Sequence, residues 1–253
     1  CREYLVNLRW SNGIACPHCG STHVYTFKDG KTYKCAEKEC KMKFNVLTKT
    51  IFENTKIPLQ KWFAALYLIT SHKKGISSIQ VGKDISVTQK TAWFMMHRLR
   101  FMFAAPALNK PLRGIVEVDE TFVGGKLSNK RQHLPNFDRF KYYKGKNFKG
   151  DVKDIVVGAV ARDGRVITRV INAVSKENLF QFIKDNIKNG TMVVTDELQQ
   201  YKALPKEGYK HNFVRHGVRQ YIKGNAHTNT IEGFWGLFKR SIIGIYHHVS
   251  SKH

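Results

Sequence analysis

Three acidic side chains crowd into one short β-branched stretch, Gly114 to Gly125, with the sequence GIVEVDETFVGG. Asp119 stands near its centre, two residues after Glu117 and directly before Glu120, although the chain has 43 Lys and Arg against 19 Asp and Glu. The apolar pattern predicts a buried strand, and a buried carboxylate is costly unless it is paired or binds a metal. The stretch therefore indicates either ion pairs with neighbouring lysines or a cation site at Asp119.

Four of the five cysteines form a second set of candidate ligands. Cys16 and Cys19 form one close pair, Cys35 and Cys40 another, and 15 residues separate the pairs. A hairpin turn predicted at Asp29-Gly30 would bring the pairs together. Two such pairs are typical of one structural Zn²⁺ held by four thiolates. Two disulfides are the alternative, but nothing in the sequence suggests secretion.

Two further acids stand where they can join Asp119. Asp196 ends an apolar strand predicted over 191–195, and Glu232 lies on a final helix predicted from 228 or 229 to 243. Thirty-five residues separate these two acids. Three carboxylates at one point would hold Mg²⁺ or Mn²⁺. Two such ions about 4 Å apart favour an in-line displacement at phosphorus.

The elements expected after Pro106 decide whether these acids meet. Their order is strand, strand, strand, helix, strand, helix, strand, helix, with a hairpin at Arg162-Asp163-Gly164 and a helix capped by Ser175. This is the order of the ribonuclease H-like α/β fold, in which the first and fourth strands are neighbours. Asp119 and Asp196 would then lie side by side, and the last helix would present Glu232 to them.

The last helix carries two further candidates. Lys239 lies two turns after Glu232 on the same helix face and is placed to hold a phosphate. Asn229 lies one turn before Glu232 and is expected to contact a phosphate or to support the acids. Trp235 is expected in the core. Three histidines either assist the reaction or lie on the surface, namely His227, His247 and His248.

The neighbours of the candidate ligands are rivals for their role. Glu117 shares the strand face of Asp119 and is the main rival. Glu120 and Glu197 each follow a candidate ligand and are therefore expected to point to the opposite face.

Residues 51–105 predict a helical domain with helices near 58–69, 76–85 and 89–102. The turn at 86–88 before the last helix is typical of a helix-turn-helix unit, whose final helix enters a major groove. Any three-helix packing module gives similar apolar stripes, so that alternative stays open. Trp93 and Phe94 are expected in the core. The candidate DNA contacts on the last helix are Gln89, Lys90, Thr91, Arg98 and Arg100.

The net charge of +24 and the pI near 9.9 indicate an anionic partner, above all nucleic acid. Ribosomal and membrane-surface proteins share such a charge, but the basic residues here are spread through well-patterned segments and are not confined to a tail. The longest apolar run, 63–69, is too short to span a bilayer. A basic insertion, 124–150, has eight Lys or Arg against one acid from Lys126 onward. It is expected either to lie along a phosphate backbone or to be a solvated loop. Its candidate DNA contacts are Lys130, Arg131 and Lys144.

Four stretches resemble DDE transposases of bacterial insertion sequences of the ISXO type, relatives of the eukaryotic Merlin elements. They are CREYLVNLRWSNGIACPHCG, VEVDETFVGGK, VVTDELQQY and HTNTIEGFWGLFKRSIIGIYHHVS. The resemblance implies metal-dependent cleavage at element ends and transfer of a 3′-OH into target DNA. It makes Asp119 and Asp196 the first two acids, Glu232 the third and Lys239 the trailing lysine. It also implies that members of the family normally continue past the position of His253.

The sequence thus predicts three parts: a zinc ribbon over 1–50, a helix-turn-helix domain over 51–105 and a ribonuclease H-like catalytic domain over 106–253. We expect a DNA transposase that acts as a homodimer or larger assembly on terminal inverted repeats and target DNA. We expect a cytoplasmic, nucleoid-associated protein in a bacterium, or a nuclear one in a eukaryote. The alternatives are a DNA-binding regulator and a ribonuclease H-like nuclease without strand transfer.

Overall fold

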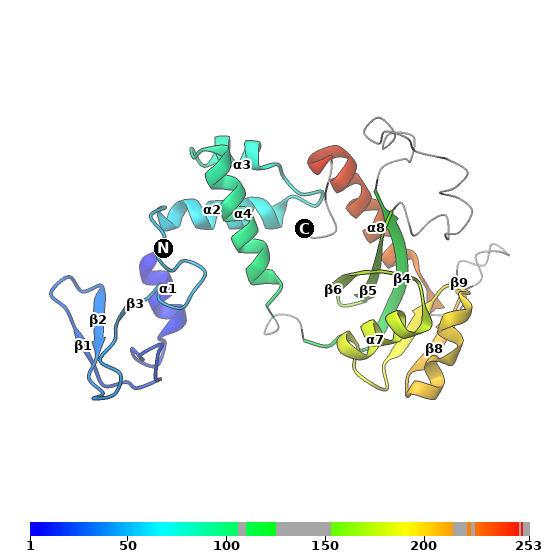
Figure 1. The fold of residues 1–253 in the computed structure, drawn as a ribbon, viewed down its shortest axis with the longest axis horizontal. Coiled ribbons are helices and arrows are strands. Elements are labelled where there is room, and N and C mark those ends of the chain that lie inside the picture. Colours follow the sequence, from blue (N-terminus) through cyan, green and yellow to red (C-terminus); the bar gives the residue numbers. More distant parts are fainter. Residues whose placement is uncertain (106–109, 125–152, 215–221, 224–225, 248, 250–253) are drawn as a thin grey trace, which may run out of the picture. The chain divides into compact units, whose positions relative to one another are not determined.

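The computed structural model describes residues 1–105, 110–124, 153–214, 222–223, 226–247 and 249 (Figure 1). By its internal contacts the chain divides into two compact units, Cys1–Ala105 and Pro106–His253. No helix within the described residues is long and apolar enough to cross a bilayer. Three candidate DNA contacts of the basic insertion, Lys130, Arg131 and Lys144, lie outside the described residues.

The second unit is built on a five-stranded mixed sheet of order β6-β5-β4-β7-β8. Its strands are β4 (Ile115–Val123), β5 (Asp154–Ala161), β6 (Val166–Ile171), β7 (Met192–Thr195) and β8 (Lys210–Phe213). Strand β4 is antiparallel to β5 and parallel to β7, and β7 is parallel to β8. The predicted ribonuclease H-like α/β fold is confirmed, with its first and fourth strands as neighbours.

Helices cover both faces of this sheet. Helix α7 (Lys176–Asn186) and the 3₁₀ segment η2 (Gln199–Glu207) pack on one face, where Leu179, Phe182 and Tyr201 share a core with alternate residues of β4 and β5. Helix α8 (Asn229–Ser241) packs on the other face through Ile231 and Trp235. Because side chains alternate along a strand, β4 contributes to both layers.

Shorter segments complete the described part of this unit. They are the paired strands β9 (Ile222–Lys223) and β10 (Ala226–His227), and the π-helical turn η4 (Ile242–Tyr246) after α8.

The first unit begins with helix α1 (Arg2–Arg9), which is followed by a zinc-ribbon-like sheet of order β1-β2-β3. The strands of this sheet are β1 (Val24–Thr26), β2 (Thr32–Cys35) and β3 (Lys43–Asn45). The predicted hairpin at Asp29-Gly30 is present, and the Asp29 carboxylate accepts hydrogen bonds from Lys31 N and Thr32 N, both at 2.9 Å. Tyr33 and Phe44 form the buried centre of a small core.

Three helices follow, α2 (Leu59–Ser71), α3 (Ser78–Asp84) and α4 (Gln89–Phe103). Thr88 caps α4 after the predicted turn at 86–88, since its hydroxyl accepts from Thr91 N at 3.2 Å. A methyl group on Gly82 would lie 3.0 Å from the Val87 carbonyl oxygen, so this glycine permits the close approach of α3 to the turn before α4.

The prediction that Trp93 and Phe94 lie in the core is wrong, because their side chains are 50% and 49% exposed. The inward face of α4 is formed by Ala92, Met95, Met96 and Leu99. These residues follow helical spacing, which places positions 93 and 94 outside the buried stripe.

Candidate active site and metal centre

Asp119 and Asp196 meet where β4 and β7 run side by side. The parallel register pairs Ile115 with Met192 and Glu117 with Val194. Two residues further along, the same register leads to Asp119 and Asp196, the residue just after β7. One carboxylate oxygen from each lies within 4.8 Å of the other. The structure therefore brings together these two predicted ligands, which are 77 positions apart in the sequence.

A third carboxylate, that of Glu120, joins this pair. Its ligand oxygen lies within 4.8 Å of those of Asp119 and Asp196. The predicted direction of Glu120, to the strand face opposite Asp119, does not keep its carboxylate out of this cluster. Its side chain does follow strand alternation, since Tyr201 on the α7 side donates to it at 3.0 Å. Asp196 lies beyond the end of β7, and there its carboxylate is near acids from both faces of β4.

Crowding and burial change the acidity of these groups. Burial raises the pKa of Asp119 to about 6, and the charges of Asp196 and Glu232 act in the same direction. Burial also raises the pKa of Glu120 to about 7, aided by Asp196 and Asp119. A divalent cation would remove this repulsion, and an all-carboxylate donor set suits Mg²⁺ or Mn²⁺. The residues present therefore fit such an ion.

Helix α8 is fixed to the sheet beside Asp119 by Trp235. The indole Nε1 donates to Asp119 Oδ2 at 3.0 Å. The ring lies over Gly158, which faces Asp119 across the β4–β5 pair. A methyl group on Gly158 would lie only 2.7 Å from two ring carbons of Trp235. The absence of a side chain at position 158 thus allows the indole to reach Asp119.

Glu232 stands in the first turn of α8, on the layer that Asp119 faces. Its charge helps to raise the pKa of Asp119, and its Oε1 accepts from the Thr228 hydroxyl at 2.9 Å. It is outside the group of ligand atoms formed by Asp119, Glu120 and Asp196. Asn229 and Lys239, the other candidates on α8, are both exposed.

Glu117, the expected rival ligand, is directed at the start of α8. Its side chain is buried, and both of its oxygens accept hydrogen bonds from the first turn of that helix. His227 lies beside it, with Nδ1 3.3 Å from Glu117 Oε1. Both side chains therefore belong to the junction between the strand and the helix.

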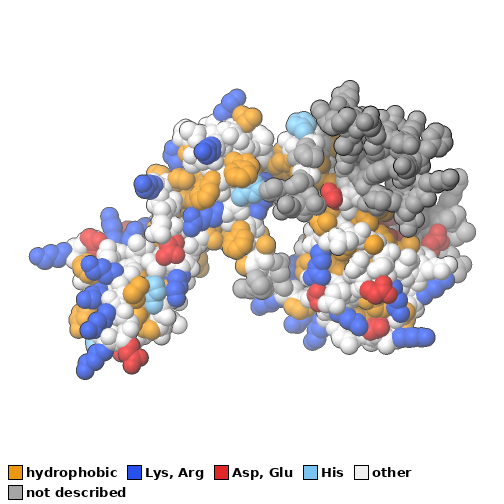
Figure 2. All heavy atoms as spheres, in the orientation of Figure 1, with side chains coloured by type: hydrophobic (Ala, Val, Ile, Leu, Met, Phe, Trp, Pro, Cys, Tyr) orange, Lys and Arg blue, Asp and Glu red, His pale blue; other side chains and the backbone are white. Residues whose placement is uncertain are grey.

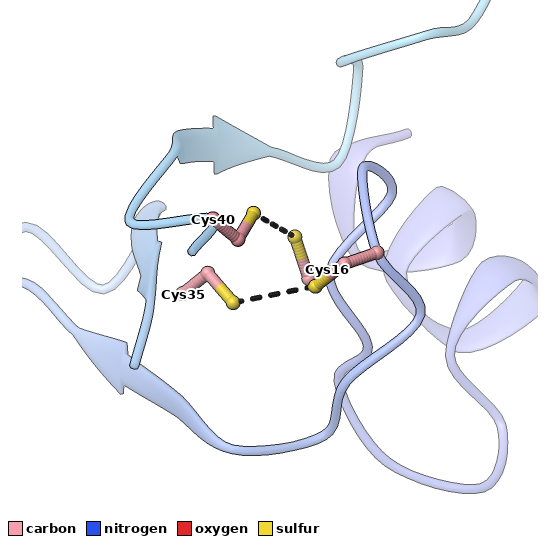
Figure 3. Close-up of side chains that lie close together, drawn as sticks. Cys16, Cys35 and Cys40 are labelled. Carbon is pink, nitrogen blue, oxygen red and sulfur yellow. Dashed lines mark hydrogen bonds between the residues drawn. The ribbon is translucent and has the colours of Figure 1, made fainter. Parts of the chain in front are cut away.

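The four cysteines of the ribbon form the second centre. The sulfurs of Cys16 and Cys40 are 3.8 Å apart (Figure 3). Those of Cys19 and Cys35 are 3.5 Å apart. Four sulfurs at about 2.3 Å from a tetrahedral Zn²⁺ lie about 3.8 Å from each other, whereas bonded sulfurs lie about 2.0 Å apart. The geometry suits one Zn²⁺ and does not suit two disulfides.

The candidate DNA contacts of α4 have different surroundings. Lys90 is exposed at the start of the helix, but the Gln89 amide donates to the Ser78 hydroxyl at 2.9 Å. The Arg98 guanidinium donates to the Glu53 carbonyl at 3.1 Å. Thr91 serves in the cap of α4, and Arg100 is half-buried.

Two family models match this chain. Residues 1–43 match the transposase zinc-ribbon domain, and residues 111–253 match the ISXO2-like transposase domain. The chain belongs to the ISXO2-like transposase family. The resemblance noted in the sequence is thus confirmed for this transposase, and it covers the part of the chain that contains the acidic cluster.

A relative of this ISXO2-like transposase occurs in Halobacterium salinarum and is described as an uncharacterized protein in transposable element ISH50. The two are 29% identical over 242 residues, which are 93% of this chain and 80% of the relative. A Mos1 transposase paired-end complex is 13% identical, with a TM-score of 0.23, over 63% of this chain and 60% of that one. A pre-cleavage Mos1 transpososome has a TM-score of 0.25 at 12% identity, over 74% and 69%. At these TM-scores no conclusion rests on the solved structures.

Sequence reasoning set Glu120 aside because of strand alternation, missed Tyr201 as part of this site, and placed Trp235 only in the core. The sequence indicates a role for Tyr201 through its position. Tyr201 stands in the same VVTDELQQY stretch as Asp196. Nothing in a single sequence indicates which acid its hydroxyl would reach.

Proposed function

We propose that this protein cleaves DNA at the ends of its element and joins the freed 3′-OH to target DNA by metal-dependent phosphoryl transfer. The observation that carries this proposal is the convergence of Asp119 and Asp196 within 4.8 Å. These acids come from neighbouring strands of a ribonuclease H-like sheet, in a chain of a transposase family. Water attacks first, and the resulting 3′-OH then attacks a target phosphodiester.

The chain's own residues hold and shape the reaction site. Asp119 and Asp196 would hold Mg²⁺ or Mn²⁺, with Glu232 as the third ligand and Glu120 as a further carboxylate within reach. Two ions, when bound, lower the pKa of the attacking oxygen and stabilise the leaving one. Trp235 orients the Asp119 carboxylate through its N–H. Lys239 would attract a phosphate of the bound DNA, and Asn229 would contact it at the start of α8.

The first unit would bind the DNA. Lys and Arg side chains are spread over its ribbon and helices on the face seen in Figure 2, and the whole chain has a net charge of +24. We propose that the ribbon holds one structural Zn²⁺ and that α4 approaches DNA with Lys90, Arg98 and Arg100. Cutting two ends in one synapse would need at least a dimer.

Substitution of single acids tests the catalytic part of this proposal. Asp119→Asn, Asp196→Asn and Glu232→Gln should each abolish cleavage of a labelled element end, because each removes a ligand charge. DNA affinity should change little, because the first unit is untouched. Glu197→Gln is the matched control, since Glu197 follows Asp196 directly but is exposed and lies outside the group of ligand atoms.

The outcomes also separate the rival functions. Loss of cleavage in Glu120→Gln together with retained cleavage in Glu232→Gln would make Glu120 the third ligand. Cleavage without joining of labelled 3′ ends to a target plasmid would indicate a nuclease. DNA binding without cleavage at any Mg²⁺ or Mn²⁺ concentration would indicate a regulator.

A further inference from the structure

Glu117 joins strand β4 to helix α8, although the proposed reaction makes no use of this acid. Its side chain is 0% exposed. It accepts hydrogen bonds from the backbone N–H of Thr230 at 2.9 Å and of Ile231 at 3.0 Å, and from the Thr230 hydroxyl at 2.8 Å. Arg162 Nε lies 3.5 Å from the same carboxylate. The first N–H groups of a helix have no partner within the helix, so Glu117 caps α8 from a neighbouring strand.

This arrangement changes the role of Thr228, which occupies the N-cap position of α8. The Thr228 side chain makes no capping hydrogen bond, although threonine is a favoured capping residue. Its hydroxyl instead donates to Glu232 Oε1 at 2.9 Å. Thr228 is only 2% exposed, so packing holds its hydroxyl in place. With the helix end capped by Glu117, the Thr228 hydroxyl can hold Glu232.

Two attachments fix the position of the helix relative to the cluster. Glu117 and Asp119 are two residues apart and face the same layer, and each binds α8 at a different turn. Glu117 holds Thr230 and Ile231 at the helix start, and Asp119 accepts from Trp235 one turn later. The helix can therefore neither rotate nor slide without breaking one of these contacts.

We propose that Glu117 and Thr228 are positioning residues that set the Glu232 carboxylate beside Asp119. Glu117 places the first turn of α8, and Thr228 orients the carboxylate within that turn. The inference rests on the proposed function, in which Glu232 faces the divalent cation. Groups that orient a ligand typically change metal affinity by about 10- to 100-fold when they are removed.

Binding of Mn²⁺ to the full chain, followed by electron paramagnetic resonance without DNA, tests the role of Thr228. Thr228→Val removes the hydroxyl at nearly constant volume and should weaken Mn²⁺ binding on the order of 10-fold. Thr228→Ser retains the hydroxyl and should restore it. Ser175→Ala is the matched control, because it removes the cap of α7 in the same unit and should leave Mn²⁺ affinity unchanged.

Hydrogen exchange tests the role of Glu117 without any metal. Glu117→Gln replaces one acceptor oxygen by an N–H donor, so amides 229–235 should exchange faster than in the unsubstituted chain. Mn²⁺ binding should weaken in the same variant. Unchanged exchange there, or exchange that rises equally in Ser175→Ala, would overturn the capping role.

Glu232→Gln separates the failure of this inference from the failure of the proposed function. If that variant binds Mn²⁺ more weakly but Thr228→Val does not, the positioning role is overturned and the proposed function stands. If Glu232→Gln itself binds Mn²⁺ normally, both the ligand assignment and the positioning role fall.

Discussion

At the scale of single residues, the site is a place where like charges are held together against their repulsion. Asp119 and Glu120 have raised pKa values of about 6 and about 7. Their hydrogen bonds from Trp235 and Tyr201 oppose this rise but do not cancel it. The folded chain therefore binds protons at these acids more tightly than the unfolded chain, in which such groups titrate near pH 4.

The first prediction concerns pH and cations. The unfolding free energy should fall as pH rises from about 4 through about 7, because protons bound to Asp119 and Glu120 in the folded state are lost. At either acid, a pKa raised this far contributes on the order of 3 kcal/mol at most to the unfolding free energy. Mn²⁺ offsets the same repulsion, so it should raise the melting temperature more at pH 8 than at pH 5.

Melting curves with and without Mn²⁺ at the two pH values measure this effect. Asp119→Asn should reduce both the pH dependence and the stabilisation by Mn²⁺. An equal Mn²⁺ increment at both pH values would show that the ion binds elsewhere.

The sequence correctly predicted that Asp119 and Asp196 are neighbours, because this follows from the strand order alone. It did not predict that the Glu120 carboxylate joins these two acids. Strand alternation correctly assigned Glu120 to the face opposite Asp119, but it says nothing of how far a carboxylate reaches at the end of a neighbouring strand. Asp196 lies past the end of β7, where alternation no longer decides the contacts.

At the scale of elements, α8 can pack closely against the sheet because one position of β5, Gly158, has no side chain. Gly158 on β5 faces Asp119 on β4, and the ring of Trp235 occupies the space above Gly158. Helix, strand pair and acid thus meet at a position where a single methyl group would not fit.

The second prediction follows from this contact. Gly158→Ala should force the Trp235 ring away from the sheet and weaken Mn²⁺ binding about 10-fold, although it changes no charge. It should also destabilise the second unit by about 1–3 kcal/mol, as overpacking usually does. Calorimetry of unfolding and of Mn²⁺ binding measures both effects.

Gly233→Ala is the control for this substitution. Gly233 lies on α8, and a methyl group added there would have nothing within 4 Å. Alanine at this position should therefore be neutral or stabilise the helix by up to about 1 kcal/mol. A Gly158→Ala variant that behaves like this control would exclude the proposed contact.

Element prediction from sequence succeeded where a pattern was long and capped, as in α4 and α7. It failed for α1, which has no buried residue, and for β3, which has three residues. Neither offers an apolar period long enough to recognise. The error on Trp93 and Phe94 has another cause, since the spacing of Ala92, Met95 and Leu99 in the sequence already indicated which face of α4 is buried.

At the scale of the whole molecule, two units have cores that are separate along the chain. The ribbon in the first unit has a small apolar centre around Tyr33 and Phe44. A core of this size provides little stability without cross-links or a metal. The second unit rests on the larger core between its sheet and α7.

The third prediction is that zinc supports only the first unit. Cys35→Ser, or removal of zinc by a chelator, should unfold the ribbon, because structural zinc supplies much of its folding free energy. DNA affinity should fall while the thermal transition of the second unit stays in place. Cys1→Ser is the matched control, since Cys1 lies outside the thiol cluster and is exposed.

Zinc content and differential scanning calorimetry on the same samples measure these effects. A Cys35→Ser protein with a full complement of zinc, or with an unchanged first transition, would contradict the assignment.

Because of the middle strand β4, the site should be sensitive to the insertion or deletion of a single residue, which the composition of the chain does not reveal. Glu117 and Asp119 turn to α8, whereas Glu120 turns to Tyr201 in the opposite layer. Deletion of Val118 would leave every charge in the chain unchanged. On one side of the deletion, however, each side chain of β4 would then point to the opposite face of the sheet. Mutation by insertion or deletion should therefore be far more damaging here than any conservative replacement.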